Sequence, residues 1–341
     1  MVHPTRLRAL GRLGVPFLAI AVLLAALELG ARVFYIPTAR SAARTYVSAD
    51  PTLPELTTFV ELDRHEQRGL YRGMLYETNH LRLRSPERPL DKPPNVTRIA
   101  VLGDSYVMGD GVLVEDTYAW RLEEEMTRVR PGRYESINTG LSGLDATHAV
   151  QRYAELGLPY HPDIAVYGFT INDIEGPHYV KTATPLRDRY ALESSPLTLW
   201  RVVGPGYVAL RERFLPPAGS YVAELRRNYF DNAAAWSDFA AALDRLADVN
   251  ESHGICSVLF LHTHLVTLNA LHPFTSIYDK VAEAGHERGF LTIPSLPAHL
   301  GLNEKPLWVS SADSHPNREG HRLLAATLAE GLAALPVECF R

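Results

Sequence analysis

The sequence predicts an α/β protein with a parallel sheet covered by helices on both faces, preceded by one transmembrane helix. From residue 98 onward, short apolar runs alternate with longer stretches of helical periodicity, and this alternation is typical of parallel sheets whose strands are buried on both faces. Polar residues that suit catalysis follow the ends of the apolar runs. Near the N-terminus, one apolar segment approaches the length that a bilayer core requires.

The N-terminal apolar segment, LGVPFLAIAVLLAAL, lies between Arg12 and Glu28 and holds 15 uncharged residues. It reaches roughly 20 residues if the charged ends of Glu28 and Arg32 extend toward lipid headgroups. Arginines and no acidic residue precede it, so the positive-inside rule predicts a cytoplasmic N-terminus. We therefore predict a cytoplasmic tip and signal anchor over residues 1–37, with the rest of the chain on the periplasmic or extracellular side of the cell membrane. A cleaved signal peptide is the alternative, although no A-x-A site follows directly.

The composition is that of an ordinary globular protein. Apolar residues make up 46% of the chain and charged residues 21%, as in ordinary soluble proteins. The length of 341 residues suffices for one large α/β domain or two small ones. The net charge is −5 and no long basic run occurs, so nucleic-acid binding has no electrostatic support. Cys256 lies in the apolar run GICSVLFL and is predicted to be a buried, inert thiol, while Cys339 lies in the tail; no disulfide is predicted.

The chain after the anchor divides into a linker and a domain. Residues 38–95 are rich in Pro, Arg, Thr and Glu and predict a juxtamembrane linker with an irregular lead-in. The domain, residues 96–341, has predicted strands at RIAVLG, YESIN, PDIAVYGF, GICSVLFLH and FLTI. Predicted helices lie at DTYAWRLEEEMTRV, DATHAVQRYAELGL, NAAAWSDFAAALDRLADVNESH, SIYDKVAEAGHER and REGHRLLAATLAEGLAAL. An insertion at about 176–230 interrupts this alternation and is either a substrate cap or a set of extra helices on the rim.

Four loops carry residues that suit a catalytic site. Ser105 follows the first strand in GDSYVMGDGV, Gly143 lies in NTGLSGLD, and Asn172 lies in GFTIND. Asp313 and His315 lie in SSADSHPNREGH, just before the last helix. Each alone has a structural explanation as a turn glycine or a helix cap. Because sites in such folds lie beyond the carboxyl ends of the strands, the order of these loops favours one shared site.

These blocks, GDS, the glycine of SGLD, the ND of TIND, and DSHPN, together resemble the four blocks of the SGNH (GDSL-type) hydrolase family over about residues 98–335. Asn79 and RIAVLGDSYVMGDGV also look like membrane-anchored bacterial members. The resemblance implies a flavodoxin-like, three-layer α/β/α domain and serine ester chemistry. It implies Ser105 as the nucleophile, His315 as the base, and Gly143 and Asn172 as partners of the Ser105 backbone amide in an oxyanion hole.

The chemistry of these residue types agrees with that assignment. A serine hydroxyl is a poor nucleophile until a neighbouring base takes its proton, and an imidazole with a pKa near roughly 6.5 suits that task. The imidazole needs an acceptor on its other nitrogen, for which Asp313 is the candidate. The usual family spacing is Asp-x-x-His, whereas here Ala312 stands three residues before His315 and Asp313 two before. A backbone carbonyl is the alternative acceptor.

The other polar candidates are assigned simpler roles. His262 and His264 end the fourth predicted strand, and we expect them to line the pocket or to make ordinary hydrogen bonds. No third ligand is evident nearby, so we predict no metal and no cofactor. Asp104, beside Ser105, is predicted to be a structural hydrogen-bonding residue. Glycines 103, 109 and 111 do not fit a phosphate-binding pattern.

The sequence leaves three functions open. The first is an exported, membrane-anchored serine esterase that hydrolyses an O-acyl ester of a small molecule, glycan or lipid through an acyl-enzyme. The second is an O-acyltransferase that uses the same residues to acetylate or deacetylate an envelope polysaccharide or exopolysaccharide. The third is a non-catalytic carbohydrate-binding or scaffold protein, against which the intact Ser105, Asn172 and His315 argue. Fold analogy does not name the substrate.

Overall fold

A parallel sheet of five strands forms the centre of the protein, in the order β4-β3-β5-β6-β7. This is the flavodoxin-like strand order, and the predicted α/β fold with a parallel sheet is therefore confirmed. The computed structural model describes residues 4–34, 69–71, 74–182, 196–215, 219–311 and 313–340.

The five strands lie within two residues of the predicted apolar runs. They are β3 (Thr97–Gly103), β4 (Tyr134–Asn138), β5 (Ile164–Phe169), β6 (Cys256–Leu261) and β7 (Leu291–Pro294). Successive side chains of β3 point to opposite faces, so that Ala100 and Leu102 join one core while Ile99 and Val101 join the other. Burial on both faces explains why the strands are continuous apolar runs rather than alternating ones.

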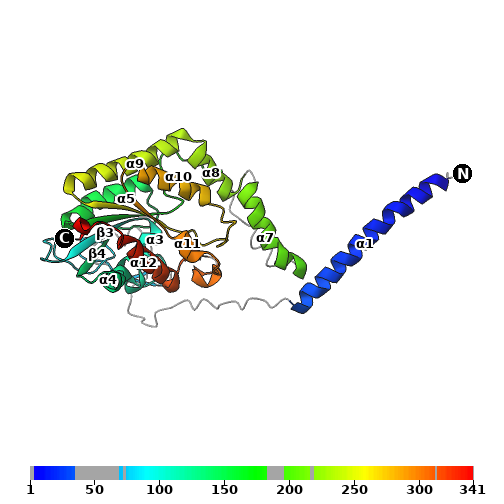
Figure 1. Ribbon diagram of the computed structural model, residues 1–341, viewed down its shortest axis with the longest axis horizontal. Helices are drawn as coiled ribbons and strands as arrows, with labels where there is room; N and C mark the ends of the chain where they lie inside the picture. The colour runs from blue at the N-terminus through cyan, green and yellow to red at the C-terminus, as the bar shows by residue number, and fades with distance from the viewer. Residues whose placement is uncertain are drawn as a thin grey trace.

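Helices cover both faces of this sheet, as Figure 1 shows. One apolar core packs under α5 (Ala146–Arg152), α8 (Tyr221–Phe230), α9 (Ala233–His253) and α10 (Thr275–His286). The opposite core packs under α4 (Tyr118–Val129) and α12 (Arg318–Leu332). The result is the three-layer arrangement that the family resemblance implies.

Smaller elements surround the sheet. The helices among them are α3 (Ser105–Met108), α7 (Thr198–Phe214) and α11 (Leu296–His299). Two antiparallel pairs join β1 (Gly69–Tyr71) to β2 (Met74–Tyr76) and β8 (Trp308–Ser310) to β9 (Asp313–Pro316). A π-helical turn, Tyr153–Gly157, follows α5. The short 3-10 turns are Val114–Asp116, Leu158–Tyr160, Lys305–Leu307 and Val337–Cys339.

The described part of the lead-in, residues 74–95, packs into the domain, while most of the predicted juxtamembrane linker lies outside the described residues. Arg84 is fully buried, and its guanidinium donates hydrogen bonds to the backbone carbonyls of Met108, Gly109 and Val112. Met108 is the last residue of α3, and Gly109 and Val112 belong to the loop that follows this helix. A buried cation that satisfies several carbonyls holds that loop in one conformation, because breaking the contacts would leave polar groups unpaired.

The two cysteines form a disulfide between Cys256 and Cys339. The prediction of an inert thiol at Cys256 was therefore wrong. The two residues are 83 positions apart in the chain, and they meet because the tail after α12 returns to the beginning of β6. Spacing alone does not reveal such a tertiary contact.

One helix among the described residues is long and apolar enough to cross a membrane. Within α1 (Pro4–Phe34), the 19 residues Pro16–Phe34 have a mean hydropathy of 2.1, and none of that window is buried. In Figure 1, α1 lies apart from the α/β domain, with α7 between them. The function of this helix as an uncleaved anchor, and the side of the membrane on which the domain lies, stay predictions.

Candidate active site

Ser105 lies at the carboxyl edge of the sheet, at the first residue of the short helix α3. The strand before it ends at Gly103, whose φ is +150° and where a Cβ atom would lie 2.5 Å from Val107 Cγ2. Glycine is therefore required at this turn. The side chain of Asp104 then caps α3 by accepting a hydrogen bond from the backbone N–H of Tyr106. Turn and cap together present the Ser105 hydroxyl at the end of the strand.

A chain of hydrogen bonds joins Ser105, His315 and Asp313. The Ser105 Oγ atom lies 2.9 Å from His315 Nε2, and His315 Nδ1 lies 2.5 Å from Asp313 Oδ1. Asp313 and His315 both belong to β9, where residues two apart point to the same side. The Asp-x-His spacing can therefore bring carboxylate and imidazole together without the longer spacing that is usual in the family.

The electrostatics around His315 are those that a general base requires. Burial of the ring lowers the pKa of His315, but the hydrogen bond and the charge of Asp313 raise it. The charges of Asp110 and Asp104 act in the same direction, and the net pKa lies above its ordinary value. The ring can thus hold a proton taken from Ser105.

A cavity of about 300 Å³ opens in front of Ser105. Gly143 lines it in a left-handed conformation, with φ at +82° and no atom within 4 Å of the place where a Cβ would stand. Neither the Ser105 nor the Gly143 backbone N–H has a hydrogen-bond acceptor among the described residues. The cavity is lined by Ser105, Tyr106, Ser142, Gly143, Ile171, Asn172, Glu175, Tyr221, His264, Ser314 and His315.

Asp104 links the loop after β3 to the loop after β5. Its carboxylate accepts hydrogen bonds from Thr170 Oγ1 at 2.7 Å and from Asn172 Nδ2 at 3.0 Å. An amide nitrogen carries two hydrogens, so Asn172 has a second hydrogen for the cavity that it lines. Burial raises the pKa of Asp104 despite these hydrogen bonds. At 3.4 Å, the Asp104 contact with Ser105 Oγ is longer than that of His315, which agrees with the structural role predicted for Asp104.

Several residues that line the cavity were not predicted from the sequence. Tyr221, the first residue of α8 in the insertion, donates a hydrogen bond from its hydroxyl to Glu175 across the cavity wall. Behind the wall, α8 packs into the core through Val222 and Leu225. The described part of the insertion thus supplies a helix, α8, whose first residue lines the cavity, while its function as a substrate cap stays a prediction. The Tyr-rich composition of the insertion was the only available signal.

The two histidines of HTH differ in position. His264 lines the cavity, as predicted. His262 is fully buried behind it, stacked on Tyr106, and neither ring nitrogen has a hydrogen-bond partner, so the expectation was wrong for this residue. Burial, with a smaller contribution from His299, lowers the pKa of His262 to about 3. Among the residues that the structure describes, no group of three or more His, Cys, Asp or Glu could hold a metal ion.

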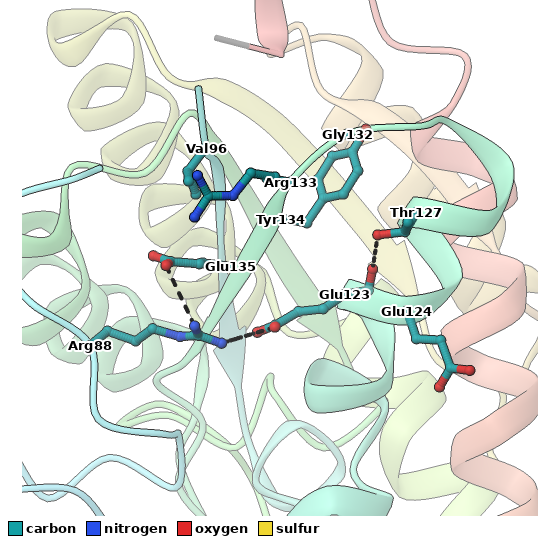
Figure 2. A pocket seen from close by; sticks show the side chains of 9 residues that line it. All are labelled: Arg88, Val96, Glu123, Glu124, Thr127, Gly132, Arg133, Tyr134 and Glu135. Atoms are coloured by element: carbon teal, nitrogen blue, oxygen red, sulfur yellow. Dashed lines mark hydrogen bonds and ion pairs between the residues drawn. The ribbon is translucent and has the colours of Figure 1, made fainter. Parts of the chain in front are cut away.

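A larger hollow, of about 390 Å³, lies at the opposite end of the sheet. Figure 2 shows it beside Val96 and Tyr134, where β3 and β4 begin. The Arg88 guanidinium lies 2.7 Å from a carboxylate oxygen of Glu123 and 3.5 Å from one of Glu135. These ion pairs neutralise the cation, and the hollow lies away from Ser105 and its partners.

A flavodoxin-like sheet that carries Ser, His and Asp in a hydrogen-bonded series at its carboxyl edge has the arrangement of a serine hydrolase. No protein-family profile matches the sequence, and no curated protein matches it. Among solved structures, a two-domain esterase (CEX) active on acetylated mannans is 15% identical, with a TM-score of 0.43 over 70% of this chain and 49% of its own. This chain thus spans about half the length of that esterase.

Two other similar structures cover more of their own length. An α/β hydrolase enzyme from the metagenome of Lake Arreo, Spain, is 15% identical, with a TM-score of 0.44 over 72% of this chain and 99% of its own. A putative lipolytic protein of the G-D-S-L family from Desulfitobacterium hafniense is 14% identical, with a TM-score of 0.41 over 69% and 99%. Because these identities and scores are low, a function for this chain must be supported by its own site.

Proposed function

We propose that the protein is an exported, membrane-anchored serine esterase that hydrolyses O-acyl esters. The observation that carries the proposal is the hydrogen-bonded series Ser105–His315–Asp313, with contacts of 2.9 and 2.5 Å, at the wall of a cavity. If Ser105 served only to begin a helix, its hydroxyl would not need a histidine as a hydrogen-bond partner. A histidine that bonds both to the serine and to a carboxylate is the arrangement that proton transfer requires.

In the proposed reaction, His315 Nε2 takes the Ser105 proton as Oγ attacks the ester carbonyl. The negative charge on the carbonyl oxygen is stabilised by the backbone N–H groups of Ser105 and Gly143 and by the Asn172 amide. The imidazolium, stabilised by Asp313, returns its proton to the departing alcohol as the acyl-enzyme forms. Water then gives a proton to His315 and attacks the acyl group; the same proton returns to Ser105 as the acid leaves.

The cavity favours a small acyl group. Its volume of about 300 Å³ is at the lower end of the range for ligand sites, about 300–1,000 Å³. The aromatic ring of Tyr221 and the carboxylate of Glu175 form the wall contributed by the insertion and the segment before it. We infer a short-chain ester, such as an acetyl group, on an alcohol, glycan or lipid headgroup that extends out of the cavity.

Export and anchoring have two sources of support. The apolar window Pro16–Phe34 has the length of a bilayer span, and the arginines before it favour a cytoplasmic N-terminus. The Cys256–Cys339 disulfide agrees with an oxidising compartment, because reducing conditions in the cytosol keep most thiols unpaired.

The experiment uses the full chain in detergent micelles, with p-nitrophenyl esters of increasing chain length and a fluorophosphonate probe. We expect hydrolysis to be fastest with acetate and the probe to label Ser105, as located by mass spectrometry of the peptides. Ser105→Ala should lower kcat/KM at least about a thousandfold and abolish labelling. Ser252→Ala, an exposed serine on α9, is the matched control and should behave as wild type.

The outcomes separate the possible functions. If neither ester hydrolysis nor labelling depends on Ser105, the esterase proposal is wrong. If release of p-nitrophenol rises when an oligosaccharide is added, and mass spectrometry detects the acylated sugar, the same serine serves acyl transfer to a hydroxyl rather than hydrolysis.

A further inference from the structure

Helix α7 (Thr198–Phe214), in the insertion, exposes one continuous apolar face. Its members recur at the spacing of a single helical stripe. Their exposed fractions run from 39% to 65%, far above those of core residues, and the stripe comprises Trp200, Val203, Tyr207, Leu210 and Phe214. Val208 and Ala209, on the other side of the helix, are buried. A soluble protein rarely leaves such a stripe in water without a partner.

The same helix is joined to α1 at its beginning. Leu197, at the N-cap position of α7, makes no side-chain cap. Instead, the Glu28 carboxylate of α1 accepts hydrogen bonds from the backbone N–H groups of Thr198 at 2.9 Å and Leu199 at 2.7 Å. These groups would otherwise be unsatisfied donors at the start of the helix. The acidic residue within the apolar helix thus caps a second helix from a distant part of the chain.

The position of Glu28 sets the depth at which α7 begins. Glu28 lies six residues before Phe34, where the apolar window ends, which at about 1.5 Å per residue is about 9 Å along the helix axis. Helices that lie in a membrane interface place their apolar face about 5–10 Å into the boundary between headgroups and acyl chains. Trp200 and Tyr207 are residue types enriched at that boundary.

The charge of α7 suits the same location. The helix contains Arg201, Arg211 and Arg213 against a single acidic residue, Glu212, a net charge of 3 − 1 = +2. Basic residues beside an apolar stripe are attracted to anionic lipid headgroups.

From these observations we propose that α7 is a second membrane element, which lies in the interface of the bilayer that α1 crosses and buries the Trp200–Phe214 stripe among the lipids. The proposal rests on the proposed membrane anchor. It gives the insertion a role in placing the active site: a short connection leads from α7 to α8, whose first residue, Tyr221, forms the cavity wall. The cavity is thereby held close to the membrane surface, where an ester on a membrane-bound molecule can reach it.

The test measures contact between Trp200 and lipid. The full chain is reconstituted into vesicles of phosphatidylcholine and phosphatidylglycerol, with or without bromine on the acyl chains, and tryptophan fluorescence is recorded. The chain has four tryptophans and none lies in α1. We expect brominated lipid to quench the wild type, and Trp200→Phe to remove most of that quenching. Trp120→Phe on α4 is the matched control, because Trp120 and Trp200 are equally exposed, at 38% and 39%, and it should retain the quenching.

A flotation assay after a carbonate wash separates this proposal from the anchor. If the chain floats with the vesicles but quenching is the same with and without Trp200, α7 is outside the lipid and the proposal is overturned while the anchor stands. If quenching depends on Trp120 instead, a different face of the domain contacts the membrane and α7 is again excluded. A chain that does not float overturns both.

Discussion

Replacing Asp313 with asparagine tests how His315 is held. The exchange keeps the shape of the side chain but removes the negative charge that lies 2.5 Å from His315 Nδ1. The amide can still occupy the site, yet it offers either an acceptor or a donor to the ring, so the tautomer with a proton on Nδ1 is no longer enforced. The stabilisation of the imidazolium in the transition state is lost at the same time.

The structure sets the magnitude of this loss. In serine proteases, the same exchange at a buried acid costs about 10⁴ in kcat. Here the side chains of Asp313 and His315 are 22% and 23% exposed, and water screens their interaction in part. We therefore expect kcat/KM to fall by about 10² to 10³, which corresponds to about 2.7–4 kcal/mol of transition-state stabilisation.

The pH profile provides the second readout. Activity requires a neutral His315, so kcat/KM of the wild type should fall as the pH drops through the raised pKa of this group. Asp313→Asn removes the hydrogen bond and the charge that raise the pKa and leaves the burial that lowers it. The acid limb should therefore move to lower pH in the variant.

The assay is kcat/KM for p-nitrophenyl acetate between pH 5 and 9, with Asp244→Asn as the control. Asp244 is 57% exposed and pairs with Arg288 on the surface. The refuting result is an Asp313→Asn variant with wild-type rate and profile while His315→Ala is inactive. Asp313 would then serve only the local turn, in which its Oδ1 accepts a hydrogen bond from the His315 backbone N–H at 3.1 Å.

Two further predictions concern the oxyanion site and the disulfide. Asn172→Ala should lower kcat by about 10² to 10³ with little change in KM, measured by steady-state kinetics; an unchanged kcat would remove Asn172 from the oxyanion site. Cys256→Ser should lower the free energy of unfolding by about 4–5 kcal/mol for a loop of this length, measured by denaturant titration of the micelle-bound chain. Reduction of the disulfide in the wild type should lower its Tm to that of the variant. A wild-type Tm that is the same with and without reductant would contradict this prediction.

The sheet could be predicted from the sequence because its signal is local. Each strand is an apolar run bounded by turn residues, and burial on both faces leaves few alternatives for a run such as IAVYGF. The strand ends then place Ser105, Gly143 and Asn172 at one edge, since parallel strands all end on the same side. Asp313 lies beside His315 because the two residues share the strand β9. The usual Asp-x-x-His spacing of the family does not predict this arrangement.

The features that could not be predicted from the sequence depend on contacts between distant segments of the chain. The disulfide joins positions 83 residues apart, and Arg84 reaches carbonyls more than 20 residues later in the chain. Neither the two cysteines nor Arg84 lies in a local sequence pattern that reveals its partner. The buried His262 was placed in the cavity by its position at a strand end, but its side chain faces the interior, where it packs on Tyr106 and Tyr118. Strand ends predict proximity to a site, and the side-chain direction of a single residue there is set by packing.

The two halves of the cavity are held in different ways, and this bears on how the site can vary. The catalytic half is fixed from the core: buried Asp104 ties the loops after β3 and β5, while Arg84 and Asp110 tie the chain after Ser105 to the lead-in and to Ser142. The opposite wall rests on Tyr221 and Glu175, from the insertion and its approach. Loops on such scaffolds tolerate change better than buried networks do. Under the two proposals above, specificity for the alcohol and the distance of the cavity from the membrane depend on the insertion, whereas the chemistry depends on residues held by the sheet.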